Sequence, residues 1–151
     1  MRILLKSVTF FVVFMVSGCG SDKPVVLITE GCNVDSMEGF IEPSPLKYVS
    51  KQGSSVSFIG WMADIKNNKV PDKVSVNIVS LNGNAFNLGV TSSKINRPDV
   101  ANANHMDKIV ESGFKVSSNL DIPVGSYNVQ LLGNYSDKTV LCPQLKELVV
   151  E

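Results

Sequence analysis

The sequence predicts an all-β domain, a sandwich of about seven or eight short strands with one short helix. Three observations support this fold class. Apolar and polar residues alternate over several short stretches, and turn-forming residues separate these stretches. Only one stretch has apolar residues at helical spacing, and the sequence shows no internal repeat or low-complexity tract.

The residues up to position 72 predict two strands joined by long connections. A compact run rich in β-branched residues predicts the first strand at 25–29. The stretch 31–45 is rich in turn-forming residues and ends in two prolines, so we expect a connection rather than a central strand or a helix. Alternation predicts the second strand at 55–61, and 66–72 has the composition of a loop.

The clearest local unit is a β-hairpin at 73–90. Apolar residues alternate over 73–81, although the pattern slips at Ile78-Val79, where we expect a bulge or a strand buried on both faces. Asn82-Gly83-Asn84 predicts the turn because its residues tolerate a positive φ. Alternation then resumes in the return strand.

One short helix is expected after Arg97-Pro98, with Asp99 as its N-terminal cap. The apolar residues at positions 100, 103, 106 and 110 have roughly helical spacing. Ser112-Gly113 ends this pattern.

The last third of the chain predicts four strands. One begins at Phe114, one follows Tyr127, and two short ones span 140–142 and 145–150. The turn Pro123-Val124-Gly125 places Tyr127 at the start of an alternating strand. This arrangement resembles the tyrosine corner of immunoglobulin-like sandwiches, in which the hydroxyl bonds the backbone and the ring fills the core. The resemblance implies an immunoglobulin-like β-sandwich.

The N-terminus has the features of a secretory signal. Arg2 and Lys6 precede an apolar run at 8–16, which is too short to cross the roughly 30 Å core of a bilayer as a helix. The run ends in Val16-Ser17-Gly18-Cys19, which resembles the lipobox of bacterial lipoproteins. This resemblance implies cleavage before Cys19 and acyl chains on its sulfur and new N-terminus, which together give a lasting membrane anchor.

The lipobox divides the chain into a signal peptide at 1–18, a lipidated tether at 19–24 and a β-sandwich domain at 25–151. In Gram-negative lipoproteins an aspartate after the acylated cysteine favours the inner membrane. Gly20 at this position therefore implies the outer membrane, if the cell is Gram-negative. The alternative is an ordinary signal peptide or an uncleaved anchor with a cysteine nearby by chance.

The net charge of the mature chain bears on its class of partner. Without residues 1–18 the chain keeps 133 residues, enough for one domain. Arg2 and Lys6 leave with that segment, so 12 basic residues remain against 14 acidic residues. The resulting net charge near −2 argues against a nucleic-acid partner, which would need a basic surface.

Two cysteines, Cys32 and Cys142, remain once Cys19 is lipidated, and they lie near the two ends of the domain. The compartment beyond the inner membrane is oxidising, so we expect them to form a structural disulfide. The alternative is a catalytic or redox thiol. A Cys-x-x-Cys motif or a neighbouring histidine would support that alternative, and the sequence has neither.

A series of five short motifs runs through the domain: Gly60-Trp61-x-x-Asp64, Pro71-x-x-Val74-x-Val76, Arg97-Pro98-Asp99-Val100-Ala101, Gly113-Phe114 and Pro123-x-Gly125-x-Tyr127. The series resembles small β-sandwich modules attached to bacterial envelope glycosyltransferases and surface-polysaccharide proteins. It covers about residues 39–132, with Met62 where alanine is usual. The resemblance implies an accessory role near glycans rather than glycosyltransferase activity.

Four residues of these motifs are candidates for a ligand site or a structural cluster: Trp61, Asp64, Arg97 and Asp99. Trp61 could stack on a sugar ring, although a lone tryptophan in a small sandwich more often fills the core. We expect Asp64 and Arg97 to form an ion pair, and Asp99 to cap the helix rather than act as a base. His105, the only histidine, is expected to be an exposed helix residue.

We therefore expect a non-enzymatic, lipid-anchored domain that binds or scaffolds an envelope polysaccharide or an envelope protein, without a cofactor or a metal. A second hypothesis is a periplasmic inhibitor or defence lipoprotein of the lysozyme-inhibitor type, acting through the loop Ser92-Ser93-Lys94. An enzyme would need a pocket that gathers Asp64, Arg97, Asp99 and His105. The sequence lacks zinc-ligand spacing, a phosphate loop and a serine-nucleophile elbow.

Overall fold

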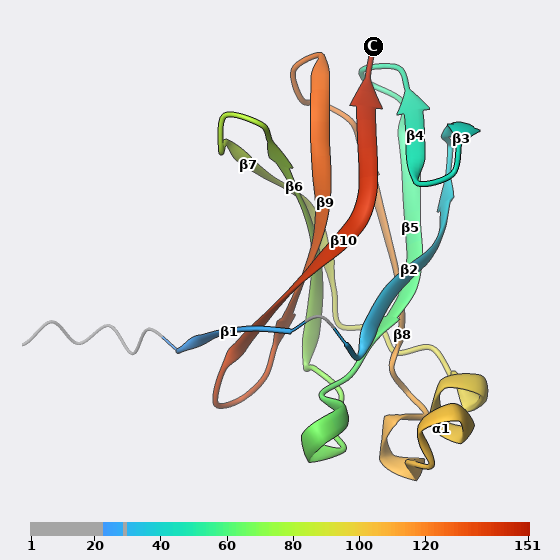
Figure 1. Ribbon diagram of the computed structural model, residues 1–151, viewed down its shortest axis with the longest axis vertical. Helices are drawn as coiled ribbons and strands as arrows, with labels where there is room; N and C mark the ends of the chain where they lie inside the picture. Colours follow the sequence, from blue (N-terminus) through green and yellow to red (C-terminus); the bar gives the residue numbers. More distant parts are fainter. Residues whose placement is uncertain (1–22, 29) are drawn as a thin grey trace, which may run out of the picture.

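The computed structural model describes residues 23–28 and 30–151, which fold into two β-sheets with one short α-helix (Figure 1). The predicted signal peptide at 1–18 and the predicted lipidation site Cys19 lie outside the described residues. The all-β prediction is confirmed, although the described residues form ten strands where seven or eight were expected.

The larger sheet contains seven of these strands: β1 (Val25–Leu27), β3 (Ile41–Ser44), β4 (Lys47–Ser50), β6 (Lys73–Ser80), β7 (Ala85–Thr91), β9 (Gly125–Asn134) and β10 (Thr139–Val150). Their order is β3-β4-β10-β9-β6-β7, with β1 also paired to β10. The smaller sheet has the order β2-β5-β8, with β2 (Cys32–Glu38), β5 (Ser55–Met62) and β8 (Gly113–Asn119). The helical segments are η1 (Ile65–Asn67) after β5, and α1 (Pro98–Asn104) and η2 (Asp107–Ile109) between β7 and β8.

Strand β10 organises the larger sheet because three strands pair with it. β9 runs antiparallel to it, while β1 and β4 pair in parallel with its two ends, at Thr139–Leu141 and Glu147–Val150. The pairing with β9 shifts register between Pro143 and Glu147, so a β-bulge interrupts the strand. The two closing strands expected from the sequence are therefore one strand with a bulge.

The two sheets share one hydrophobic core. Its fully buried side chains come from both sheets and include Phe58, Met62, Phe114, Ile78, Leu131 and Leu148. The disulfide predicted between Cys32 and Cys142 forms and joins β2 to β10, one strand of each sheet. The covalent bond and the core therefore hold the same two layers together.

The expectation that 31–45 is a connection is wrong, because β2 and β3 occupy most of it. β2 buries Val34 and Met37, three positions apart, since its pairing with β5 shifts register between Val34 and Ser36. A bulge of this kind breaks the two-residue alternation by which a strand is recognised in a sequence.

The predicted helix forms, but its N-terminus differs from the expectation. α1 begins at Pro98, whose fixed φ suits the first helical position, so Asp99 lies inside the first turn and is not the cap. The helix ends at Asn104, and the residue that caps it, His105, adopts the left-handed conformation with a φ of 54°. After this break, η2 buries Ile109 instead of continuing the predicted helical face.

Two local predictions are confirmed. β6 and β7 form the hairpin expected at 73–90, with Gly83 at a φ of +87° in its turn. Its register shift lies at Val76-Asn77, two residues before the predicted slip. The hydroxyl of Tyr127 donates a 2.6 Å hydrogen bond to the carbonyl oxygen of Pro123, which is the contact expected of a tyrosine corner.

Candidate functional site

The structure divides the predicted cluster between two places. The expected ion pair of Asp64 and Arg97 is wrong, because Arg97 pairs with Asp35 and Asp99, whereas Asp64 pairs with Lys138. Asp35 is 62 positions from Arg97, and Lys138 is 74 positions from Asp64. Asp99 is two positions from Arg97, but sequence proximity gives no sign of the pairings with Asp35 and Lys138.

Arg97 holds the start of α1 against β2. Its guanidinium nitrogens lie 2.6 Å from a carboxylate oxygen of Asp35 and 2.6 Å from one of Asp99, and Nε donates to Asp99 at 2.9 Å. The hydrogen bonds to Asp99 and Asp35 raise the pKa of Arg97, although its burial opposes this. In return, Arg97 lowers the pKa of Asp99 to about 2. These charge-assisted contacts are those of a structural clamp.

Gly113 allows the Arg97 segment to lie close to β8. A Cβ at this position would lie 2.7 Å from the carbonyl oxygen of Ile95 and 2.9 Å from Cγ of Arg97. Ile95 and Gly113 also exchange backbone hydrogen bonds of 2.8 and 3.0 Å. The Arg-Pro-Asp and Gly-Phe motifs therefore meet through backbone packing.

Trp61 lies partly buried in a second, smaller apolar cluster between the smaller sheet and α1. In the sheet it stands opposite Asn33 on β2 and Gly113 on β8. It packs against the buried members of the cluster, which are Ala63, Val100, Ala101 and Ile109. These contacts favour a core role for Trp61 over a sugar-stacking platform.

Asp64 caps η1 and closes the loop around it. One carboxylate oxygen accepts the backbone N–H of Asn67 at 3.1 Å, and the other accepts from the side chains of Asn67 and Lys138. Burial alone would raise the pKa of Asp64, but the hydrogen bonds from Lys138 and Asn67 outweigh it, so this pKa is lowered. Asp64 therefore has a structural role as an ionised cap.

The strongest candidate for a binding surface lies beside the bulge of β10. Leu145 is 87 % exposed and Leu46 is 48 % exposed. They line an open groove of about 480 Å³. We call this groove, together with the side chains of Leu46 and Leu145, the leucine surface. The rest of the groove is formed by Ser44, Pro45, Lys47, Asn128, Gln144, Lys146 and Glu147. Large apolar side chains within a polar rim are typical of a protein-binding surface.

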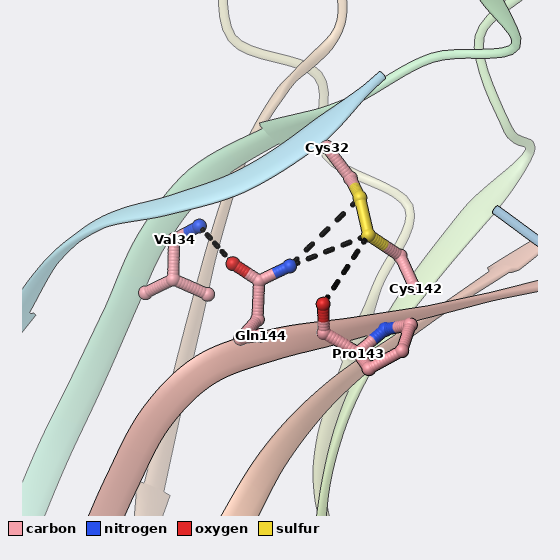
Figure 2. Close-up of a disulfide and its surroundings, with 5 residues drawn as sticks. All are labelled: Cys32, Val34, Cys142, Pro143 and Gln144. Atoms are coloured by element: carbon pink, nitrogen blue, oxygen red, sulfur yellow. Dashed lines mark hydrogen bonds between the residues drawn. A yellow bond between two sulfur atoms is a disulfide. The ribbon is translucent and has the colours of Figure 1, made fainter. Parts of the chain in front are cut away.

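The bulge that carries Leu145 is held on both sides. Figure 2 shows the side chain of Gln144 between the disulfide and the backbone of Val34. Its Oε1 accepts the Val34 N–H at 2.9 Å, and its Nε2 lies 3.3 and 3.8 Å from the two disulfide sulfurs. On the other side, the N–H of Glu147 donates to the carbonyl oxygen of Leu46 at 2.8 Å. Hydrogen bonds on both sides therefore fix the backbone that carries Leu145.

Leu46 adopts the left-handed backbone conformation, with a φ of 68°. For a residue with a side chain this conformation costs roughly 1–2 kcal/mol. Leu46 is also half exposed, so burial of the rest of its side chain offsets only part of that cost. Strained backbone residues are enriched at ligand-binding and switch sites, so Leu46 is a candidate contact residue.

Neither leucine was a candidate in the sequence. Leu145 falls in a stretch whose alternation predicts a strand, and alternation does not show which strand residues a bulge leaves exposed. The other predicted sites are located as follows. His105 is exposed, as expected, but it caps the C-terminus of α1 instead of lying within the helix. Ser92-Ser93-Lys94 is exposed between β7 and α1.

Within residues 23–28 and 30–151, no three His, Cys, Asp or Glu side chains gather closely enough to hold a metal ion. In the same described part of the chain, no helix is long and apolar enough to cross a membrane. A scan against protein-family models, a search of curated proteins and a search of solved structures each found no significant match.

Proposed function

We propose that this protein is a lipid-anchored, non-enzymatic module of the bacterial cell envelope that binds a protein partner through its leucine surface. The lipobox Val16-Ser17-Gly18-Cys19 supports the anchor, and Gly20 supports the outer membrane in a Gram-negative cell. A disulfide between two sheets and the Tyr127 corner support an immunoglobulin-like sandwich as the scaffold.

The candidate ionisable side chains have structural roles, and this supports binding rather than catalysis. Arg97 is engaged by two carboxylates, and Asp64 is engaged by Lys138 and by the N-terminus of η1. A general acid or base needs a proton position open to a substrate. Contacts of this kind instead fix the ends of loops and helices.

The exposed pair Leu46 and Leu145 carries the proposal. A partner that inserts one large apolar side chain into the groove would cover both leucines, and the polar rim would supply hydrogen bonds. The resemblance to modules of surface-polysaccharide proteins suggests a partner that works near glycans. Direct sugar binding is less well supported, because Trp61 packs against the cluster beside α1.

Site-specific cross-linking in living cells tests this function. A photoreactive amino acid is placed at Ser44, an exposed residue of the groove, and at Asn84 in the exposed β6–β7 turn as the control. We expect irradiation to join one dominant envelope protein to the Ser44 probe and none to the Asn84 probe. Mass spectrometry of the conjugate identifies the partner.

A matched pair of leucine variants ties the capture to the surface. Leu145→Ser is expected to remove the cross-link at Ser44, whereas Leu81→Ser is expected to keep it, because Leu145 and Leu81 are both 87 % exposed. Equal capture by both variants would show that the leucine surface is not the contact. Capture of glycan in place of protein would return the function to a polysaccharide-binding module.

A further inference from the structure

The short strand β1 exposes an unusual amount of apolar surface. Val25 is 68 % exposed and Leu27 is 62 % exposed, and they share one face of the strand. β1 pairs in parallel with Thr139–Leu141, so it lies at the end of β10 away from the C-terminus (Figure 1). A ridge of large apolar residues on a strand is a contact surface or an aggregation hazard.

Two open grooves, each partly lined by apolar side chains, adjoin this ridge. One, of about 460 Å³, includes Leu27, Ile28 and Ile65 in its wall. The other, of about 290 Å³, includes Val26, Ile28 and Val140. Together with the exposed face of Val25 and Leu27, these grooves form what we call the β1 surface.

The two residues before β1, Lys23 and Pro24, are hydrogen-bonded to the larger sheet, and they lie close in sequence to the predicted anchor Cys19. The carbonyl oxygen of Pro24 accepts the N–H of Thr139 at 3.0 Å, and Nζ of Lys23 donates to the carbonyl oxygen of Tyr135 at 2.8 Å. From Cys19 to Pro24 an extended chain spans at most roughly 17 Å. An acylated Cys19 would therefore keep β1 close to the lipid headgroups.

We propose that the β1 surface lies against the lipid bilayer in the anchored protein, with Val25 and Leu27 at the boundary between headgroups and acyl chains. The inference rests on the proposed lipid anchor, which supplies the proximity. Charges around the surface are of both signs, with Lys66 and Lys138 beside Glu30 and Asp64. Apolar contact rather than attraction to anionic lipid would hold it, so the orientation is expected to change little with salt.

Fluorescence quenching by brominated lipids tests this orientation. Val25→Trp and Leu27→Trp place a reporter on the β1 surface, and Val124→Trp places one at a matched valine, 64 % exposed, before β9. Each protein is purified from membranes, its acylation is read from its mass, and it is reconstituted in phosphatidylethanolamine and phosphatidylglycerol vesicles with brominated acyl chains. The unaltered protein supplies the baseline emission of Trp61.

We expect brominated chains to quench the emission of Val25→Trp and Leu27→Trp, with no change for Val124→Trp or the unaltered protein. If brominated chains leave the emission of all the acylated variants unchanged, the orientation is overturned and the proposed anchor still stands. Cross-linking of β1 to β1 of a second copy, without quenching, would overturn it in favour of a dimer. A mass without acyl chains would instead overturn the proposed anchor, and it is known before any vesicle is made.

Discussion

The Cys32–Cys142 disulfide offers the sharpest test of how the two sheets are held together. The bond joins residues 110 positions apart, and its Cα atoms are 6.6 Å apart. Closing a loop of this length in the unfolded chain stabilises the fold by about 5 kcal/mol at 25 °C on the chain-entropy account. Domains of this size have a free energy of unfolding of roughly 5–15 kcal/mol. The reduced protein is therefore expected to be marginally stable.

Urea unfolding measures this contribution. The variant Cys32→Ala/Cys142→Ala is compared with the disulfide-bonded chain, both carrying Cys19→Ser to remove the third thiol. With a denaturant slope of about 1–3 kcal/mol/M, the midpoint of the variant should fall by roughly 2–5 M. Trp61 fluorescence and circular dichroism follow the transition. A reductant should lower the midpoint of the disulfide-bonded chain and leave the variant unchanged.

A small loss of stability in the variant would contradict this role of the disulfide. A loss below about 1 kcal/mol, with an unchanged denaturant slope, would mean that the bond does not restrain the unfolded chain. The core contributed by Phe58, Phe114 and Leu131 would then hold the sheets together without the covalent link.

Three further predictions concern the clamp, the η1 cap and the leucine surface. Arg97→Met keeps the side-chain stem but loses both carboxylate contacts, so we expect a loss of about 1 kcal/mol in unfolding free energy and faster amide exchange in α1. Unchanged exchange over Pro98–Asn104 would contradict the clamp. Because the pKa of Asp64 is lowered on folding, its stabilisation is present above pH 3.8, its ordinary pKa, and is lost as pH falls through the folded value. Urea midpoints below pH 4 should therefore decline more steeply for the native chain than for Asp64→Asn, and parallel curves would exclude this role. Leu46→Gly relieves a φ of 68° and should raise the free energy of unfolding by about 1 kcal/mol relative to Leu46→Ser, measured by the same urea transition.

Features that depend on neighbouring residues were predictable from the sequence. The hairpin at 73–90 follows from alternation around Asn82-Gly83-Asn84, and the Tyr127 contact spans only four positions. The disulfide between Cys32 and Cys142 is long-range, but with Cys19 set aside only one pairing remains. Local chemistry or simple counting is sufficient in each case.

Features that depend on a bulge or a distant partner were not predictable. β2 was missed because a register shift after Val34 breaks its alternation. The distant partner of Arg97 is Asp35, 62 positions away, and nothing in the local sequence distinguishes that carboxylate from Asp64. The exposure of Leu145 likewise follows from how β10 pairs with its neighbours, which composition does not show.

The backbone conformation of Leu46 allows its effects on stability and on binding to be measured separately. If its side chain had only a structural role, glycine would suit a position with a φ of 68° better, because about half of the leucine side chain is exposed and burial of the rest offsets only part of the strain. The proposed partner gives the side chain a use that offsets this strain. Leu46→Gly should then be more stable than Leu46→Ser, yet both should lose the cross-link from Ser44 to the same extent. If Leu46→Gly keeps the cross-link, the strain at position 46 has no connection with binding, and Leu145 alone would form the contact.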